Sequence, residues 1–125
     1  MNLEDREQRG DDAELVTRAA VSAADSLGLT SAQLARVIGA STATVSRMRH
    51  GRAQVQPGHK HWELALLLIR LYRSLAAICA GDEAVVRAWM RNYNRDLNGV
   101  PADMIDRIEG LTTTLAYVDS SRAAA

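Results

Sequence analysis

The segment from Ser31 to Gly51, SAQLARVIGASTATVSRMRHG, limits what this chain can fold into more than any other part of it. Its apolar residues recur at helical spacing in two short runs: Leu34, Ala35 and Ile38, then Val45 and Met48. Two short helices can therefore share a core, and Gly39 stands between them, where a left-handed turn is common. Hydroxyl side chains stand where each helix needs an N-terminal cap: Thr30 or Ser31 for the first, Ser41 or Thr42 for the second. The segment predicts a helix-turn-helix, which places its second helix in the major groove of DNA.

The outward positions of the second predicted helix carry hydroxyl and guanidinium groups, with no carboxylate among them. The candidate DNA-binding residues are Ser41, Thr42, Thr44, Ser46, Arg47, Arg49 and Arg52. Arg47 or Arg49 can bond guanine, while the hydroxyl groups contact phosphates. One alternative is an ordinary helical hairpin with a polar outer face. Another is a helix-turn-helix that has lost DNA binding, because the helix offers no Asn or Gln for adenine.

The formal charge of the chain is zero, but it is distributed unevenly. Residues 1–30 have a balance of −4, residues 31–73 of +6 and residues 74–125 of −2. The basic block surrounds the predicted helix-turn-helix and contains His50, His59 and His61. Because the neutralisation of phosphates dominates affinity for nucleic acid, this block favours DNA as a partner despite the neutral total. A solvated basic face is the alternative.

Composition disfavours membrane proteins and enzymes. The longest apolar run is Leu64–Ile69, and the first ten residues are polar rather than signal-like, so we expect a cytoplasmic protein. Cys79 is the only cysteine; no internal disulfide can form, and we expect the thiol in the core. No His, Asp and Glu set has metal-ligand spacing, and no nucleophile elbow or glycine-rich phosphate loop is present. We therefore expect no catalysis, cofactor or metal.

Helical periodicity along the chain predicts an all-α fold without strands. After a disordered tail over residues 1–10, Asp11 or Asp12 caps a helix that ends near Leu27. The predicted buried face of this helix consists of Leu15, Val16, Ala19, Ala20, Ala23 and Leu27. Further helices are expected over residues 83–91 and 101–108, and a last one over 111–121, with Gly110 separating the last two.

The longest apolar helix is predicted over residues 61–79. One side is expected to be buried through Trp62, Leu66, Ile69, Leu75, Ala76 and Cys79. More apolar residues widen that side beyond a single stripe, namely Leu64, Leu67, Leu68, Leu71 and Tyr72. Such a helix is central or shared with another subunit. We favour a homodimer through this helix or the N-terminal one, and a monomeric bundle is the alternative.

The segment AWMRNYNRDLNGVPADMIDRI, residues 88–108, resembles the toxin-binding domain of Xre/MbcA/ParS-type antitoxins. The matching residues are Trp89, Met90, Asn94, Leu97, Gly99, Pro101, Asp103, Met104 and Ile105. The order of elements from about Ala13 onward is similar as well. Two departures concern the loop: the interval from Asn94 to Pro101 is one residue short, and Tyr93 replaces a proline. Trp89 and Asn94 also have a simpler structural interpretation, as a packing anchor and as a hydrogen-bond partner of loop backbone.

The resemblance implies an N-terminal Xre-like helix-turn-helix joined by a long helix to a small toxin-binding module. It implies an antitoxin that neutralises a NAD-consuming RES-domain toxin and represses its own operon. The candidate toxin-binding residues are Trp89, Asn94, Pro101, Asp119 and Ser121. Residues 110–125 are the candidates to enter the toxin's NAD cleft, and their deletion is expected to abolish protection while leaving the fold. The implied division is a tail (1–10), a DNA-binding domain (11–60), a central helix (61–80) and a toxin-binding domain (81–125). A stand-alone helix-turn-helix repressor is the alternative function.

Overall fold

The computed structural model of the protein describes residues 2–124. Over these residues the chain forms seven helices: α1 (Leu3–Leu27), α2 (Ser31–Ile38), α3 (Thr42–Arg49), α4 (Lys60–Ile78), α5 (Glu83–Arg91), α6 (Pro101–Met104) and α7 (Ile108–Ala124). Within that range there is no strand, and the one β-type pairing is an isolated bridge between Asn94 and Gly99. The predicted all-α class is confirmed.

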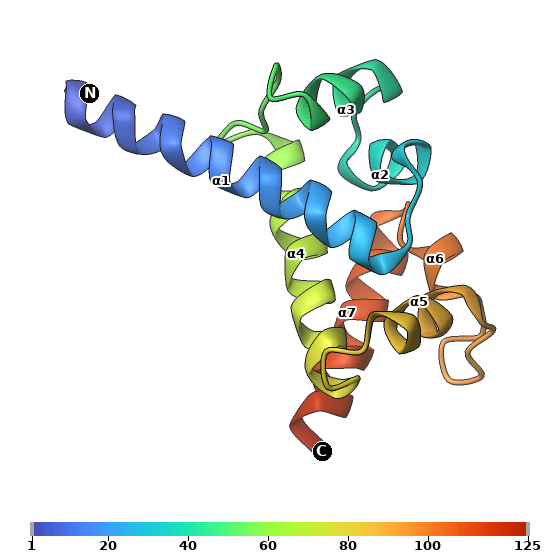
Figure 1. Ribbon diagram of the computed structural model, residues 1–125. Coiled ribbons are helices and arrows are strands. Elements are labelled where there is room, and N and C mark those ends of the chain that lie inside the picture. The colour runs from blue at the N-terminus through green and yellow to red at the C-terminus, as the bar shows by residue number, and fades with distance from the viewer. Residues whose placement is uncertain (1, 125) are drawn as a thin grey trace.

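Helix α4 runs through the middle of the molecule (Figure 1). It packs against α1 and α7 most extensively and also contacts α2 and α5. Helices α2 and α3 lie on one side of α1, while α5, α6 and α7 form the opposite end of the fold. The first turns of α1 extend away from the rest of the molecule.

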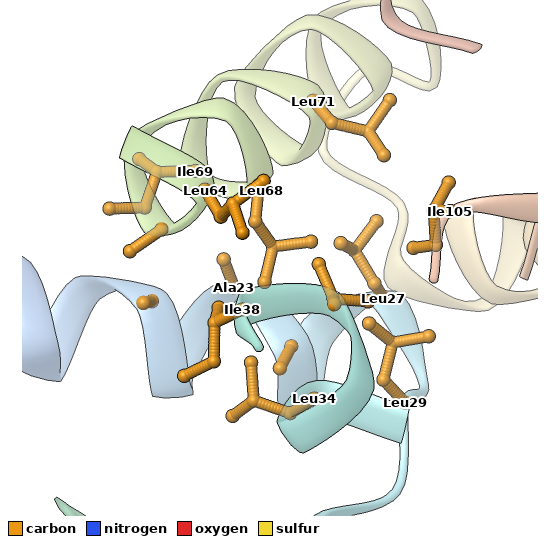
Figure 2. Packing of buried hydrophobic residues seen from close by; sticks show 14 of the residues in the cluster. Ala23, Leu27, Leu29, Leu34, Ile38, Leu64, Leu68, Ile69, Leu71 and Ile105 are labelled. Carbon is orange, nitrogen blue, oxygen red and sulfur yellow. The ribbon is translucent and has the colours of Figure 1, made fainter. Parts of the chain in front are cut away.

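One continuous hydrophobic core joins the two ends of the molecule. Figure 2 shows side chains of α1, α2 and α4 converging, with Leu71 of α4 and Ile105, which follows α6, on the far side of the same cluster. Leu27, Leu34 and Leu68 are at most 1% exposed, and full burial of such a side chain contributes about 1.5–3 kcal/mol. If either end of the molecule loses its packing, core side chains of the other end therefore become exposed to solvent.

Helix α1 begins at Leu3, so the predicted tail and the predicted start at Asp11 or Asp12 are wrong for residues 2–10; Met1 lies outside the described residues. The Asn2 side chain caps the helix by accepting a hydrogen bond from the Asp5 amide at 2.8 Å. Acidic residues in the first turn, here Glu4 and Asp5, favour this start because they lie at the positive end of the helix dipole. Local capping thus extends the helix although residues 2–11 are exposed.

The buried faces of α1 and α4 differ from the predicted ones. Leu15 is 65% exposed and Leu66 is 43% exposed. The residues of α1 that are buried are mostly small: Ala13, Thr17, Ala20, Ala23, Ala24 and Leu27. Small side chains let α4 approach closely. The buried residues of α4 are mostly larger: Leu64, Ala65, Leu68, Ile69, Leu71, Ser74 and Leu75. The sizes of the side chains that face one another where α1 and α4 cross decide which face is buried. The apolar pattern of one helix alone does not contain this information.

Gly110 does not separate two helices, as the sequence pattern had suggested, but lies inside the first turn of α7. A Cβ atom at this position would overlap the main-chain carbonyl oxygen of Met104. The glycine is therefore required by the close approach of α6 to α7 rather than by a turn. The short helix over residues 101–108 correspondingly ends at Met104.

Cys79 is half-buried at the C-terminal end of α4. Burial raises the pKa of its thiol, and the nearby Asp82 carboxylate raises the pKa further. No single helix within residues 2–124 is long and apolar enough to span a membrane; only α4 and α5 taken together, bent by 115°, reach that length and composition.

Candidate functional site

The helix-turn-helix forms where the sequence predicts it, because each helix end is closed by a residue close in sequence. Thr30 Oγ1 accepts a hydrogen bond from the Gln33 amide at 3.1 Å, while Gln33 Oε1 accepts from the Thr30 amide at 2.8 Å. Gly39 ends α2 with a φ of 74°, a left-handed conformation that suits glycine. Ser41 caps α3 by accepting a hydrogen bond from the Thr44 amide at 3.1 Å. These contacts close the turn that joins α2 to α3.

The outer face of α3 carries most of the predicted DNA-binding residues. Thr42, Ser46 and Arg47 are exposed, as is Arg52 beyond the helix, and Thr44 is half-buried. Arg47 Nη2 donates to Thr44 Oγ1 at 3.0 Å, so its guanidinium lies along the outer face of the helix. No acidic residue is present in α3. This face can therefore approach phosphates and base edges without like-charge repulsion.

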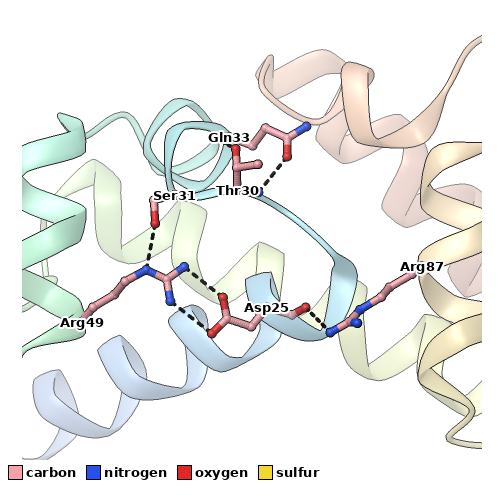
Figure 3. Close-up of polar contacts among 6 residues, drawn as sticks. All are labelled: Asp25, Thr30, Ser31, Gln33, Arg49 and Arg87. Atoms are coloured by element: carbon pink, nitrogen blue, oxygen red, sulfur yellow. Dashed lines mark hydrogen bonds and ion pairs between the residues drawn. The ribbon is translucent and has the colours of Figure 1, made fainter.

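Arg49 departs from the prediction, because its guanidinium is directed back into the protein (Figure 3). Its Nη2 and Nη1 atoms donate to Oδ1 and Oδ2 of Asp25 in α1 at 2.9 and 3.1 Å. Its Nε atom donates to Ser31 Oγ in α2 at 2.9 Å. The hydrogen bond to Asp25 raises the pKa of Arg49, so the residue stays charged. In this arrangement Arg49 joins three helices, whereas Arg47 faces outward.

The same segment of α1 contacts α5 on its other side. Arg87 Nη2 donates to the main-chain oxygen of Asp25 at 3.0 Å, and Ser26 Oγ donates to Glu83 Oε1 at 2.9 Å. A cleft of about 400 Å³ lies between α1, α3 and α5. It is lined by Arg18, Val21, Ser22, Asp25, Ser26, Met48, Arg49, Glu83 and Arg87. The last two turns of α1 thus lie between the helix-turn-helix and the C-terminal part of the chain.

The C-terminal part is built around a closed loop between α5 and α6. Asn94 and Gly99 exchange main-chain hydrogen bonds at 2.8 and 3.2 Å, and Asn94 Oδ1 also accepts from the Leu97 amide at 3.0 Å. Asn94 therefore satisfies loop backbone, as its structural interpretation predicts. Pro101, the first residue of α6, is buried, so the loop is anchored at both ends.

Trp89 is half-buried and stacks against Tyr117 of α7, with ring centroids 6.4 Å apart. Tyr117 Oη donates to Asp96 Oδ2 at 2.7 Å, and this hydrogen bond raises the pKa of the phenol. Large apolar side chains also lie on the surface of this end of the molecule: Val85 is 48% exposed, Ile108 59% and Tyr93 61%. Exposed apolar side chains of this size are suited to contact with a protein partner.

Asp119 and Ser121 lie in α7, which packs along α4 and is not a free tail. Asp119 pairs with Arg70 and also accepts from Ser74 Oγ at 2.8 Å, while Ser121 Oγ donates to the Tyr117 carbonyl at 3.0 Å. Beside them a groove of about 760 Å³ is lined by Leu66, Ile69, Arg70, Arg73, Ser74, Asp119, Arg122 and Ala123. Deletion of residues 110–125 would remove four buried residues, namely Leu111, Thr114, Leu115 and Val118. The expectation that such a chain keeps its fold is therefore wrong.

Sequence reasoning missed Asp25, Arg87 and Arg70 as contact residues. Their hydrogen-bond partners lie 24, 62 and 49 positions away in the chain. Helical periodicity relates residues three or four positions apart, so it carries no signal of such pairs. The unlike charges of the blocks are consistent with the Arg49–Asp25 and Arg70–Asp119 pairs, but not with the contact of Arg87 to a main-chain oxygen.

Comparison with known families covers nearly the whole chain. Residues 8–70 match the antitoxin Xre-like helix-turn-helix domain, and residues 74–123 match the antitoxin Xre/MbcA/ParS C-terminal toxin-binding domain. No curated protein sequence matches the chain. The first match spans the capped α2–α3 unit, and the second spans the closed loop with its stacked Trp89. The chain therefore belongs to the Xre/MbcA/ParS-type antitoxins, whose toxin-binding domain implies a toxin protein as partner and whose helix-turn-helix implies DNA binding.

Proposed function

We propose that this antitoxin neutralises a NAD-consuming RES-domain toxin by binding at or near the toxin's NAD cleft, and that it represses its own operon through α3. The observation that carries the proposal is the agreement between the toxin-binding match over residues 74–123 and the exposed apolar side chains of α5 to α7. Neutralisation then requires binding alone, and the protein performs no chemistry. As such an antitoxin it works in the cytoplasm, where its toxin and its operator are found.

The C-terminal end of α7 is the part that enters the cleft. Residues 122–124 are exposed, and Asp119 exchanges Arg70 for basic residues of the toxin that otherwise hold the NAD phosphates. Trp89, together with the loop held by Asn94 and Pro101, provides the surrounding contact. The RES class of the partner rests on the family resemblance.

The test is co-expression of the toxin with a chain that ends at Asp119. This truncation keeps all four buried residues of α7, Leu111, Thr114, Leu115 and Val118, and removes only the residues beyond Asp119. We expect the shortened chain to stay folded and to lose growth rescue, while a chain lacking residues 2–10, exposed at the other end, rescues fully. Rescue by both chains would contradict entry into the cleft. A chain that binds its promoter but never copurifies with a RES-domain protein would favour the stand-alone repressor.

Operator binding is tested by a mobility-shift titration on DNA from upstream of the operon, at fixed salt. The Arg47→Ala substitution removes an outward guanidinium and is expected to weaken binding by about 1–3 kcal/mol. Arg95→Ala, which removes an exposed arginine of the loop after α5, is the matched control and should leave binding unchanged. Equal affinity of all three proteins would contradict a role of Arg47 in DNA contact.

A homodimer is part of the proposal because α4 leaves apolar surface uncovered. Leu66 is 43% exposed and lines the groove beside α7, whereas Leu15 offers a second apolar position on α1. Sedimentation of Leu66→Glu and Leu15→Glu distinguishes the two helices as the interface. The substitution in the interface is expected to give a monomer, and an unchanged dimer in both variants would place the contact elsewhere.

A further inference from the structure

We infer that Asp25 sets the position of α3 and links it to α5, so that Arg49 is a positioning residue and the toxin-binding half helps to orient the DNA-binding helix. The inference deepens the proposed operator binding and rests on it for its meaning. Its structural part is testable without DNA. It concerns one short stretch of α1, which contacts both halves of the molecule.

Helix α3 needs an anchor besides its core contacts. It has eight residues, of which only Val45 and Met48 are buried. Two apolar contacts on one side of a short helix leave it free to roll and tilt about them. Arg49 lies in the last turn of α3, outside this pair. A contact at that point restricts the remaining freedom, because Arg49 ties the end of α3 to Asp25 of α1 and Ser31 of α2.

The Arg49 contact has the geometry that fixes an orientation. Two guanidinium nitrogens meet the two carboxylate oxygens of Asp25 at 2.9 and 3.1 Å, and the third nitrogen meets Ser31 Oγ at 2.9 Å. A two-point pairing of planar groups defines angle as well as distance. The Arg49 side chain is 28% exposed and the Asp25 side chain 52%, so water competes for the pair mainly on the Asp25 side. A guanidinium whose three nitrogens all bond within the chain is not available to read a base.

Asp25 is itself held from the other side by α5. Its main-chain oxygen accepts from Arg87 Nη2 at 3.0 Å, and the next residue, Ser26, donates to Glu83 at 2.9 Å. Figure 3 shows the Asp25 side chain facing Arg49 while its main chain faces Arg87. Gly28, just beyond, has a φ of 80°, and a Cβ atom there would lie 3.2 Å from Arg87 Cγ. The C-terminal end of α1 is thus in close contact with Arg87 on one side and with Arg49 on the other.

A displacement of α5 would therefore move α3 through a single residue, Asp25, which contacts both helices. Helix α5 carries Trp89 and lies in the toxin-binding match, so a partner that shifts α5 also shifts Arg87 and Glu83. The coupling needs no global rearrangement, because the side chain and the main chain of Asp25 belong to the same rigid helical turn. Toxin binding and DNA binding then influence one another reciprocally.

The first experiment measures amide hydrogen exchange of residues 42–49 in the full-length free protein. Asp25→Ala and Arg87→Ala are expected to raise exchange in α3, with about a fivefold effect for Asp25→Ala, the scale of a good ion pair, and a smaller one for Arg87→Ala. Arg91→Ala, an exposed arginine one turn further along α5, is the matched control. If α3 exchanges equally in the Arg87→Ala and Arg91→Ala proteins, the link to α5 does not exist.

The second experiment measures promoter affinity, where the two explanations of Arg49 predict opposite signs. If Arg49 contacts DNA, Asp25→Ala removes a negative charge near the basic face and tightens binding. If Arg49 is a positioning residue, Asp25→Ala weakens binding about fivefold, and adding Arg49→Ala to it weakens binding little more. The salt dependence then keeps its wild-type slope, because no phosphate contact is lost. Tighter binding by Asp25→Ala, or a slope reduced by Arg49→Ala, overturns the inference. Wild-type protein without promoter affinity would refute the proposed operator binding, and the exchange experiment would still decide the coupling.

Discussion

The α2–α3 unit and the region from α5 to α7 are stabilised in different ways. In the first, each helix end is closed by a residue at most five positions away, as in the Thr30–Gln33 capping box and the Ser41 cap. In the second, the decisive contacts join different helices: Trp89 of α5 meets Tyr117 of α7, and Gly110 of α7 lies against the Met104 carbonyl of α6. The comparison teaches that one region is specified by local chemistry and the other by how its pieces fit together.

The largest effect is expected for Gly110→Ala. The new Cβ would overlap a main-chain carbonyl oxygen that cannot rotate away, so the cost should lie near the upper end of overpacking, about 3 kcal/mol. Gly10→Ala is the matched control, because this helical glycine has no atom near its missing Cβ and should gain up to about 1 kcal/mol. Urea unfolding of both proteins measures the difference. A cost below about 1 kcal/mol for Gly110→Ala would show that α6 and α7 are not packed as described.

An intermediate effect is expected for Ser41→Ala, which removes the cap of α3. The lost hydrogen bond to the Thr44 amide should cost about 1 kcal/mol. Thr42→Ala, at the next and exposed position, removes a similar hydroxyl that caps nothing and should cost far less. Thermal unfolding of the pair is the measurement. Equal costs would mean that the α2–α3 unit does not depend on its local caps.

The smallest effect is expected for Tyr117→Phe, which keeps the stack on Trp89 and removes only the hydrogen bond to Asp96. We expect a loss of about 0.5 kcal/mol or less at neutral pH, because the group is near the surface. The raised pKa of Tyr117 means that its contribution is present below the unfolded value, about 10, and is lost as the pH rises through the folded value. Unfolding measured from pH 7 to 11 should therefore show the two proteins converging. A difference that grows with pH would contradict the Tyr117–Asp96 pairing.

The same contrast explains how much could be predicted from the sequence. The two short helices and the left-handed Gly39 follow from local spacing, and the structure confirms them. Of the two cap candidates that the sequence offers for each helix, the structure uses Thr30 and Ser41. The buried faces of α1 and α4 could not be predicted, because Leu15 and Leu66 are as apolar as the residues that replaced them in the core. The outward Arg47 and the inward Arg49 could not be told apart either, since the distinction depends on Asp25. In the C-terminal half, the family resemblance located the module, but Gly110 and Asp119 acquire their roles only from α6 and α4.

The single core described above has a consequence for how this antitoxin is lost. Because residues from Ala20 to Val118 share one packed cluster, unfolding of one half exposes core residues of the other. A protease that captures the unfolded chain removes both binding surfaces at one time. The toxin and the promoter would thus be released at the same rate, which is set by one unfolding equilibrium.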